Sequence, residues 1–428
     1  MDNRFKIAYK RRTQTGWLMW LILMLPFFFA FLVELLGLPY MVRYSVDVVW
    51  VLAFFYILFA QRKKHTPITG NLGKVATAFF IYTALVYIVQ FQSPLYYLWG
   101  VRCSFRFFVA FFAFALFLKT EDVAYYFKAL DIFFWINIAV SVVQYFGLGL
   151  VQDNLGGIFG SATGVNGYTT IFFSIVLTKS ILNYLEKKES LQMLLLKSAA
   201  ALLVAALAEL KFFFFFFAMI VMLATFFTNF TWRKLGAVAG GLTAVVLFAL
   251  LLEDMFGFEG FLSLDFISDY ADSDKGYTGR GDINRLNAIA TINEEWLKSG
   301  WQRLFGLGLG NCDSAGFEFL VTPFFETYGN MHYTWFYYAF LYLETGWIGL
   351  ALYWGFFVLA FFEIWKIEKR SEGVTKSYCR MGRILSICCV VLSVYNIGLR
   401  TEGAYMMFFA LAVPFALDRE NRKKRVTV

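Results

Sequence analysis

The residues best suited to chemistry in this chain lie in one polar interval, residues 253–331, and in the histidine that follows it. The interval contains Arg280, Arg285 and the glycine-rich sequence FGLGLGN at residues 305–311. It is followed by His332, one of 2 histidines in the chain. Guanidinium groups bind phosphate through paired hydrogen bonds, and imidazole can accept a proton near neutral pH. These residue types predict a site that binds an anion and removes a proton.

The elements that hold this interval in place must be membrane helices. Hydrophobic residues make up 60% of the 428 residues and charged residues 16%, which is more apolar than a soluble domain of this length can bury. Apolar runs of about 17 to 25 residues, each able to cross a hydrocarbon core of roughly 30 Å, recur along the chain. The runs are continuous rather than alternating, which predicts helices and not a barrel.

Basic residues between the apolar runs set the expected topology, because cytoplasmic loops are rich in Lys and Arg. They predict an all-α polytopic protein with about twelve spans and both termini in the cytoplasm. Residues 1–252 would form transmembrane helices 1–9 and residues 253–345 an extracytoplasmic loop with surface or re-entrant helices. Residues 346–428 would form helices 10–12 and a basic cytoplasmic tail. The net charge of +8 is explained by this topology and does not imply a nucleic-acid partner.

Two segments near His332 are expected to lie on or partly in the membrane. Residues 283–301 alternate apolar and charged positions with a helical period, which predicts an amphipathic surface helix. Residues 333–365 are apolar but are interrupted by ETG at residues 344–346. Two spans here would place the basic loop at residues 366–383 outside, so we expect a surface or re-entrant helix before Gly346 and one span after it.

Basic residues on the outer face oppose the positive-inside trend and need another explanation. Besides Arg280 and Arg285, the expected outer-face residues are Arg102, Arg106, Lys211 and Arg400. Arg102 and Arg106 lie one turn apart on one helix, about 10 and 16 Å below its outer end. Charge at that depth is costly unless it is compensated. A structural pair with a carboxylate such as Glu34 or Asp47 and a bound anionic substrate both remain open.

His332 has alternatives as a proton acceptor. A lone histidine is commonly a hydrogen-bonded structural residue, and the carboxylates of Asp282 and Glu344 are further candidate bases. Glu209 and Asn166 are additional outer-face candidates. No second histidine or cysteine cluster accompanies His332, and the acidic run at residues 265–274 lacks the spacing of an EF-hand loop. We therefore predict no metal site.

The order of these motifs resembles a known family. An arginine that opens a helix (Arg285 in NRLNAIATINEEW), the segment LFGLGLGN, a histidine before an aromatic helix, and ETGWIGLALY are together similar to the O-antigen ligase and Wzy-type polysaccharide polymerase superfamily. The resemblance is strongest over residues 279–352. Weaker counterparts are FGSATGVNGY, which contains Asn166, and AELK, which contains Glu209 and Lys211. The family tends to place an arginine where this chain has Lys211.

The resemblance implies a metal-independent, inverting glycosyltransferase with a GT-C-like fold and no cofactor. It would act at the outer face of a bacterial inner (plasma) membrane on a glycan linked to undecaprenyl pyrophosphate. His332 would orient or deprotonate the acceptor hydroxyl, and Arg285, with Arg280 and Lys211, would neutralise the leaving lipid pyrophosphate. The other basic residues assigned to the pyrophosphate are Arg102, Arg106 and Arg400.

Within this family we favour a polymerase, which transfers the growing glycan to the next lipid-linked repeat unit and can work with a chain-length regulator protein. A ligase that transfers the glycan to lipid A core is the alternative in the same family. A flippase for lipid-linked oligosaccharides is the alternative of another class, because it too would surround an anionic headgroup with arginines. A non-enzymatic membrane scaffold would leave Arg102 and Arg106 unexplained.

Overall fold

The computed structural model describes residues 14–63, 70–228 and 282–426, together with separate positions between 232 and 250. Every regular element in these ranges is helical. Arg280, the acidic run at residues 265–274 and most of the predicted ninth span lie outside the described residues. The structure therefore bears on the predicted loop only from Asp282 onward.

Among the described residues, 7 helices are long and apolar enough to cross a membrane. They are α1 (Gln14–Ala30, continued by the π-helix Phe31–Leu35), α2 (Ser45–Lys63), α3 (Gly70–Val89), α4 (Pro94–Phe117), α5 (Thr120–Leu148), α14 (Tyr337–Lys369) and α15 (Gly373–Tyr395). Four further long helices of the described residues belong to the bundle: α6 (Asn166–Leu185), α7 (Leu191–Leu207), α8 (Lys211–Phe227) and α16 (Ala404–Val426). The prediction of an all-helical fold is confirmed for the described residues, and the 7 long apolar helices are compatible with a polytopic membrane protein. The number of twelve spans and the GT-C-like fold stay predictions.

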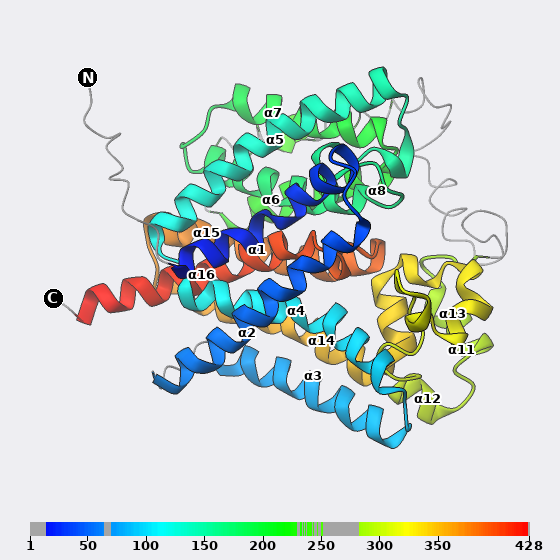
Figure 1. The fold of residues 1–428 in the computed structure, drawn as a ribbon. Helices are drawn as coiled ribbons and strands as arrows, with labels where there is room; N and C mark the ends of the chain where they lie inside the picture. The colour runs from blue at the N-terminus through cyan, green and yellow to red at the C-terminus, as the bar shows by residue number, and fades with distance from the viewer. Residues whose placement is uncertain are drawn as a thin grey trace.

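The long helices run between two ends of the molecule (Figure 1). At one end, on the right in Figure 1, lie the short helices α11 (Ala288–Glu295), α12 (Gly300–Phe305) and α13 (Pro323–Tyr328). At the other end, on the left, α1 begins and α16 ends. The short helices that precede and follow the glycine-rich segment are thus gathered at the end of the bundle opposite the described termini.

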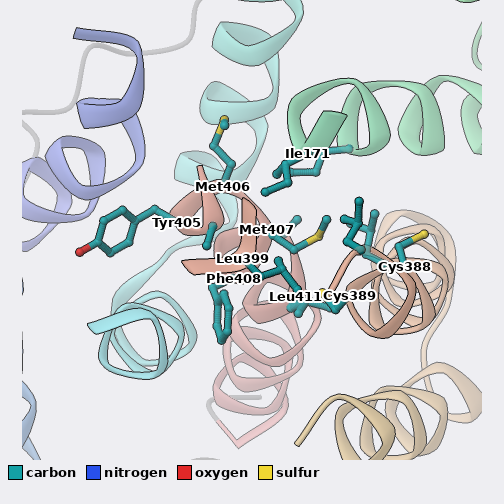
Figure 2. Close-up of a cluster of buried hydrophobic side chains, with 14 of the residues drawn as sticks. Ile171, Cys388, Cys389, Leu399, Tyr405, Met406, Met407, Phe408 and Leu411 are labelled. Carbon is teal, nitrogen blue, oxygen red and sulfur yellow. The ribbon is translucent and has the colours of Figure 1, made fainter. Parts of the chain in front are cut away.

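The first half of α16 forms the centre of the bundle. Residues 404–413 are all fully buried, and Figure 2 shows their side chains meeting Ile171 of α6 and Cys388 and Cys389 of α15. From α4, the ring of Phe107 lies 4.9 Å from that of Tyr405. Because this half-helix is enclosed by α4, α6 and α15, the turn that precedes it, residues 396–403, is held firmly at the end of the bundle that carries α11–α13.

Helix α14 is broken at Gly346, where the backbone has φ of 62°. A Cβ at this glycine would lie 2.3 Å from the carbonyl oxygen of Leu304, and a Cβ at Gly306 would lie 2.4 Å from that of Glu344. Two glycines therefore allow the end of α12 to cross the break in α14 at backbone contact. The part of α14 before the break, residues 337–345, is buried throughout and at about 1.5 Å per residue is too short to cross a bilayer.

The structure corrects the prediction of one amphipathic surface helix over residues 283–301. The structure forms α11 over Ala288–Glu295 only, and α12 begins separately at Gly300. Trp296 ends the first helix because its ring turns inward and packs 5.4 Å from the ring of Tyr333. Ser299 then caps the second helix by accepting a hydrogen bond from the backbone N–H of Gln302. The sequence period suggested one continuous helix, but aromatic packing and a cap divide it.

Candidate functional site

The glycine-rich segment at residues 305–311 is a structural wedge between α14 and the start of α4. Gln92 donates a 2.6 Å hydrogen bond to the carbonyl of Leu309, and the backbone N–H of Gly308 donates to the carbonyl of Glu344 at 2.8 Å. A Cβ on Gly310 would lie 1.9 Å from the carbonyl oxygen of Tyr96. Only glycine permits this approach, so the segment holds the loop against the bundle.

Glu344, a candidate base in the sequence, also fastens this loop. Its side chain is 1% exposed, and its carboxylate accepts a 3.2 Å hydrogen bond from the backbone N–H of Cys312. A buried carboxylate engaged in this way stabilises the loop and is closed off from solvent. Glu344 is therefore less suited to proton transfer than a partly exposed side chain.

His332 is held in an unusual backbone conformation and is partly open to solvent. Its φ of 55° places it in the left-handed region, which non-glycine residues adopt uncommonly and often at functional sites. The imidazole stacks on Trp335 with ring centroids 4.1 Å apart. Its Nδ1 lies 3.9 Å from Oδ2 of Asp282, and the side chains are 38% and 1% exposed respectively. The backbone N–H of Ile283 donates to the carbonyl of Met331 at 3.0 Å, which holds the segments that carry Asp282 and His332 next to each other.

Arg285 lies three residues after Asp282, and its guanidinium packs against aromatic rings. The guanidinium carbon is 4.9 Å from the ring centroid of Phe336 and 4.5 Å from that of Tyr395. The hydroxyl of Tyr338 donates a 2.5 Å hydrogen bond to the carbonyl of Arg285. Aromatic faces attract a delocalised cation, so the rings define where this charge sits, beside the loop that carries His332.

The hairpin tip between α7 and α8 reaches the same region. Phe212, directly after Lys211, stacks on the ring of Tyr395 with centroids 4.1 Å apart, and Tyr395 is the residue whose ring also meets Arg285. Glu209, at the tip, has φ of 52° and accepts a hydrogen bond from Gln152 at 3.1 Å. The end of α15 therefore joins the Lys211 tip to the Arg285 segment.

Asn166 lies at the start of α6, next to the turn that follows α15. Its amide donates a hydrogen bond of 2.5 Å to Asp153. A Cβ on the neighbouring Gly167 would lie 3.6 Å from the side-chain nitrogen of Asn396. We call Asp282, Arg285, His332 and Lys211 the candidate site; Asn166 borders it through this turn.

Three of the predicted phosphate-binding arginines have carboxylate partners instead. Arg102 bonds to Asp47 at 2.8 Å. Arg106 lies 3.1 Å from Glu402 and 3.8 Å from Asp47. Arg400 forms an ion pair with Asp313. Glu34, the other carboxylate considered for this role, accepts from the backbone N–H of Ser161.

A fifth residue, Arg43, completes what we call the buried ion network: Arg43, Asp47, Arg102, Arg106 and Glu402. Arg43 pairs with Glu402, and the hydroxyl of Tyr168 donates to the same carboxylate at 2.5 Å. Burial alone would raise the pKa of Glu402, but Arg43 and Arg106 bring it well below the ordinary value. Glu402 is thus a charged, compensated group at the turn before α16.

Sequence reasoning missed the aromatic surroundings of the candidate site. Phe336 and Tyr395, whose rings receive Arg285, are far apart in the sequence; Phe336 lies in a run rich in aromatic residues, whereas Tyr395 lies in a mainly aliphatic one. The signal that could have pointed to one of them is position, since Phe336 lies four residues after His332 in a helix-forming stretch. Nothing in the sequence singles out Tyr395.

No protein-family model matches this chain, and no curated protein matches it either. The residues and their geometry therefore carry the functional conclusion.

Proposed function

We propose that this protein is a membrane glycosyltransferase of the polysaccharide-polymerase type, related to the O-antigen polymerases. It would transfer a glycan from undecaprenyl pyrophosphate to the next lipid-linked repeat unit at the outer face of a bacterial plasma membrane. The observation that carries the proposal is the convergence of a carboxylate-backed histidine with Arg285 and the Lys211 tip at one end of the bundle.

His332 is suited to act as the base. The buried carboxylate of Asp282 faces Nδ1, an arrangement that orients an imidazole. The 3.9 Å separation is an ion-pair distance, and a hydrogen bond would need approach to about 3 Å. Nδ1 is itself buried, so the part of the side chain that remains exposed, 38% of it, is the part that can meet an acceptor hydroxyl.

Arg285 and Lys211 are suited to the leaving group. A departing pyrophosphate carries negative charge that develops as the glycosidic bond breaks, and cations fixed in advance stabilise that charge without reorganising. The rings of Phe336 and Tyr395 fix the Arg285 guanidinium, and its planar fork can bind two phosphate oxygens at once. Lys211, next to Phe212 whose ring stacks on Tyr395, would add a second positive charge.

The proposed step is a single displacement. The acceptor oxygen forms a bond to the anomeric carbon, the bond from that carbon to the pyrophosphate oxygen breaks, and the hydroxyl proton passes to His332. The products are the lengthened glycan on its lipid and free undecaprenyl pyrophosphate. Attack opposite the leaving group inverts the anomeric configuration, and the cations of Arg285 and Lys211 take the role that a metal ion plays in other phosphate sites.

A flippase is the second candidate, and the pairing of the deep arginines weighs against it. A flippase would need charges available to a headgroup within the bilayer. The arginines of α4, Arg102 and Arg106, are instead bonded to Asp47 and Glu402. The candidate site lies at the end of the bundle, where a transferase acting at the membrane surface would need it.

A transfer assay with matched variants tests the proposal. Purified protein in detergent is given a lipid-pyrophosphate-linked repeat unit, and released undecaprenyl pyrophosphate is measured. We expect His332→Ala to lower the rate by about 10²- to 10⁴-fold, the range for loss of a general base. Arg285→Ala should be similarly impaired, whereas Arg303→Ala, an exposed arginine of α12 at the same end, should keep the wild-type rate.

Two further measurements distinguish the polymerase from a ligase and from a flippase: the acceptor that transfer requires, and movement of the lipid across a membrane. Transfer that occurs only when lipid A core is added would make the protein a ligase. Movement of the lipid across a proteoliposome membrane without any transfer would replace the proposal with a flippase. Equal rates in wild type and in both site variants would contradict the assigned site.

A further inference from the structure

A cavity of about 110 Å³ lies at the other end of the bundle, between α6 and α15. Its polar lining residues are Lys179, Asn183, Lys188, Ser377 and Tyr378, and the remaining lining residues are apolar. All its lining residues lie in the described part of the chain, and none of them is a carboxylate. The residues that line the cavity thus carry two ammonium groups, an amide and two hydroxyls.

The cavity is far from the candidate site. Ser377 and Tyr395 are 18 residues apart on α15, which corresponds to about 27 Å along a helix. The hydrocarbon core of a bilayer is roughly 30 Å thick. Since Tyr395 meets Arg285, the cavity lies near the opposite membrane interface, the cytoplasmic one on the predicted topology.

The two lysines keep donor capacity for a ligand. The ammonium of Lys179 bonds to Asp131 at 3.3 Å, and that of Lys188 bonds to Glu186 at 2.6 Å. Each ammonium has three donors, so one ion pair leaves others available. Asp131 is shared, because Lys197 also lies 3.3 Å from it.

Ser377 is the second, independent feature. It is 9% exposed, it lines the cavity, and within the described part of the chain its hydroxyl has no hydrogen-bond partner. The hydroxyl is therefore available to donate a hydrogen bond to a bound oxyanion. The start of α15 lies beside it: Val374 lines the cavity, and the N-cap residue, Glu372, makes no side-chain cap. The first-turn N–H groups and the helix dipole favour an anion there.

We propose that this cavity binds a phosphate group, carried by an anionic phospholipid or by a soluble phosphate compound. Several hydrogen-bond donors surround this cavity, and a phosphate group, which has several oxygens, can accept from more of them than a ligand carboxylate can. Basic pockets between transmembrane helices on the cytoplasmic side are a recognised form of lipid headgroup site. The proposal does not depend on the glycosyltransferase function.

Binding to the purified full chain tests it. The delipidated protein in neutral detergent is titrated with dioctanoyl phosphatidylglycerol, dioctanoyl phosphatidylcholine and inorganic phosphate. We expect phosphatidylglycerol to bind, and binding to weaken about 10-fold in Lys188→Ala and measurably in Ser377→Ala. Lys366→Ala is the matched control, since Lys366 is an exposed lysine near the same end that pairs with Glu363.

The probes distinguish the source of the phosphate. Binding of phosphatidylglycerol but not of inorganic phosphate, with the expected loss in both variants, would identify a lipid headgroup site. Binding of inorganic phosphate with the same losses would identify a soluble ligand. Equal weakening by Lys366→Ala, or phosphatidylglycerol binding unaffected by both cavity variants, would overturn the proposal. Ser377→Ala removes one oxygen only, so a fold defect cannot mimic its effect if the variant remains monodisperse.

Discussion

Glu402 is the residue on which the buried ion network depends most. Its side chain is 2% exposed and lies between Arg43, which pairs with it, and Arg106, 3.1 Å away and 3% exposed. The substitution Glu402→Gln keeps the size of the side chain but removes its charge. Arg106 would then keep Asp47, at 3.8 Å, as its one carboxylate partner among the described residues, beside its hydrogen bond to the carbonyl of Arg400.

The expected cost follows from this burial. Removing one partner of a buried ion pair leaves an uncompensated charge and costs about 3 to 5 kcal/mol. Exposed ion pairs contribute only about 0 to 1 kcal/mol. Glu363→Gln is therefore the control, because Glu363 pairs with Lys366, whose side chain is 61% exposed. We expect the two Glu→Gln variants to differ by at least about 2 kcal/mol in free energy of unfolding.

Unfolding in a denaturing-detergent titration, followed by circular dichroism, measures this difference. Adding Arg106→Met to Glu402→Gln should recover part of the loss, because the buried charge is then removed together with its partner. A cost for Glu402→Gln no larger than that for Glu363→Gln would refute the reasoning. So would strictly additive effects of the two substitutions.

The pH dependence has a definite sign. Arg43 and Arg106 hold the pKa of Glu402 below its ordinary value, against the effect of burial. The carboxylate is charged in the folded protein at a pH where the unfolded chain, with a pKa of about 4.3, already binds a proton. Its stabilising contribution is therefore complete at neutral pH and declines as pH falls below about 4.3. Glu402→Gln should remove this part of the acid sensitivity.

Three further predictions concern the loop and the site. Asp282→Asn should lower the transfer rate more than 10-fold with little change in lipid binding, as measured by single-turnover kinetics, because a carboxylate that orients a base acts on the chemical step. Arg285→Lys should weaken binding of the lipid pyrophosphate about 10-fold in a direct titration, because lysine keeps the charge but loses the planar fork and the aromatic stacking. Gly310→Ala should lower the free energy of unfolding by at least about 2 kcal/mol. Gly300→Ala is the control, because a Cβ there meets nothing within 4 Å, and its free energy of unfolding should stay within about 1 kcal/mol of wild type. Equal effects of the two substitutions would contradict the role of the glycine-rich segment in holding the loop against the bundle.

The helical membrane architecture could be predicted because it depends on composition and run length alone. A bilayer requires every backbone group to be bonded within its own helix, so a continuous apolar run has one solution. The break at Gly346 could be anticipated from the charge of the following loop. The division of residues 283–301 could not, because it depends on Trp296 packing against Tyr333, a contact between distant residues.

The ion-pair partners of the charged side chains could not be predicted from the sequence either. Spacing along α4 shows that Arg102 and Arg106 share a face, and Asp47 was one of two carboxylates considered. The spacing cannot show that Glu402, some 300 residues later in the chain, pairs with Arg106. The proximity of Asp282 to His332, and of Arg285 to Tyr395, likewise arises from the path of the loop over the bundle.

The most direct test of the central claim is the product made by the purified protein from a single substrate. The protein is incubated in detergent with one lipid-pyrophosphate-linked repeat unit and a chelator, and the glycans are separated by gel beside those from His332→Ala. We predict a ladder of increasing glycan lengths from the wild type and none from the variant. Absence of any lengthened glycan from the wild type, or an unchanged ladder from His332→Ala, would contradict the proposed polymerase and its base.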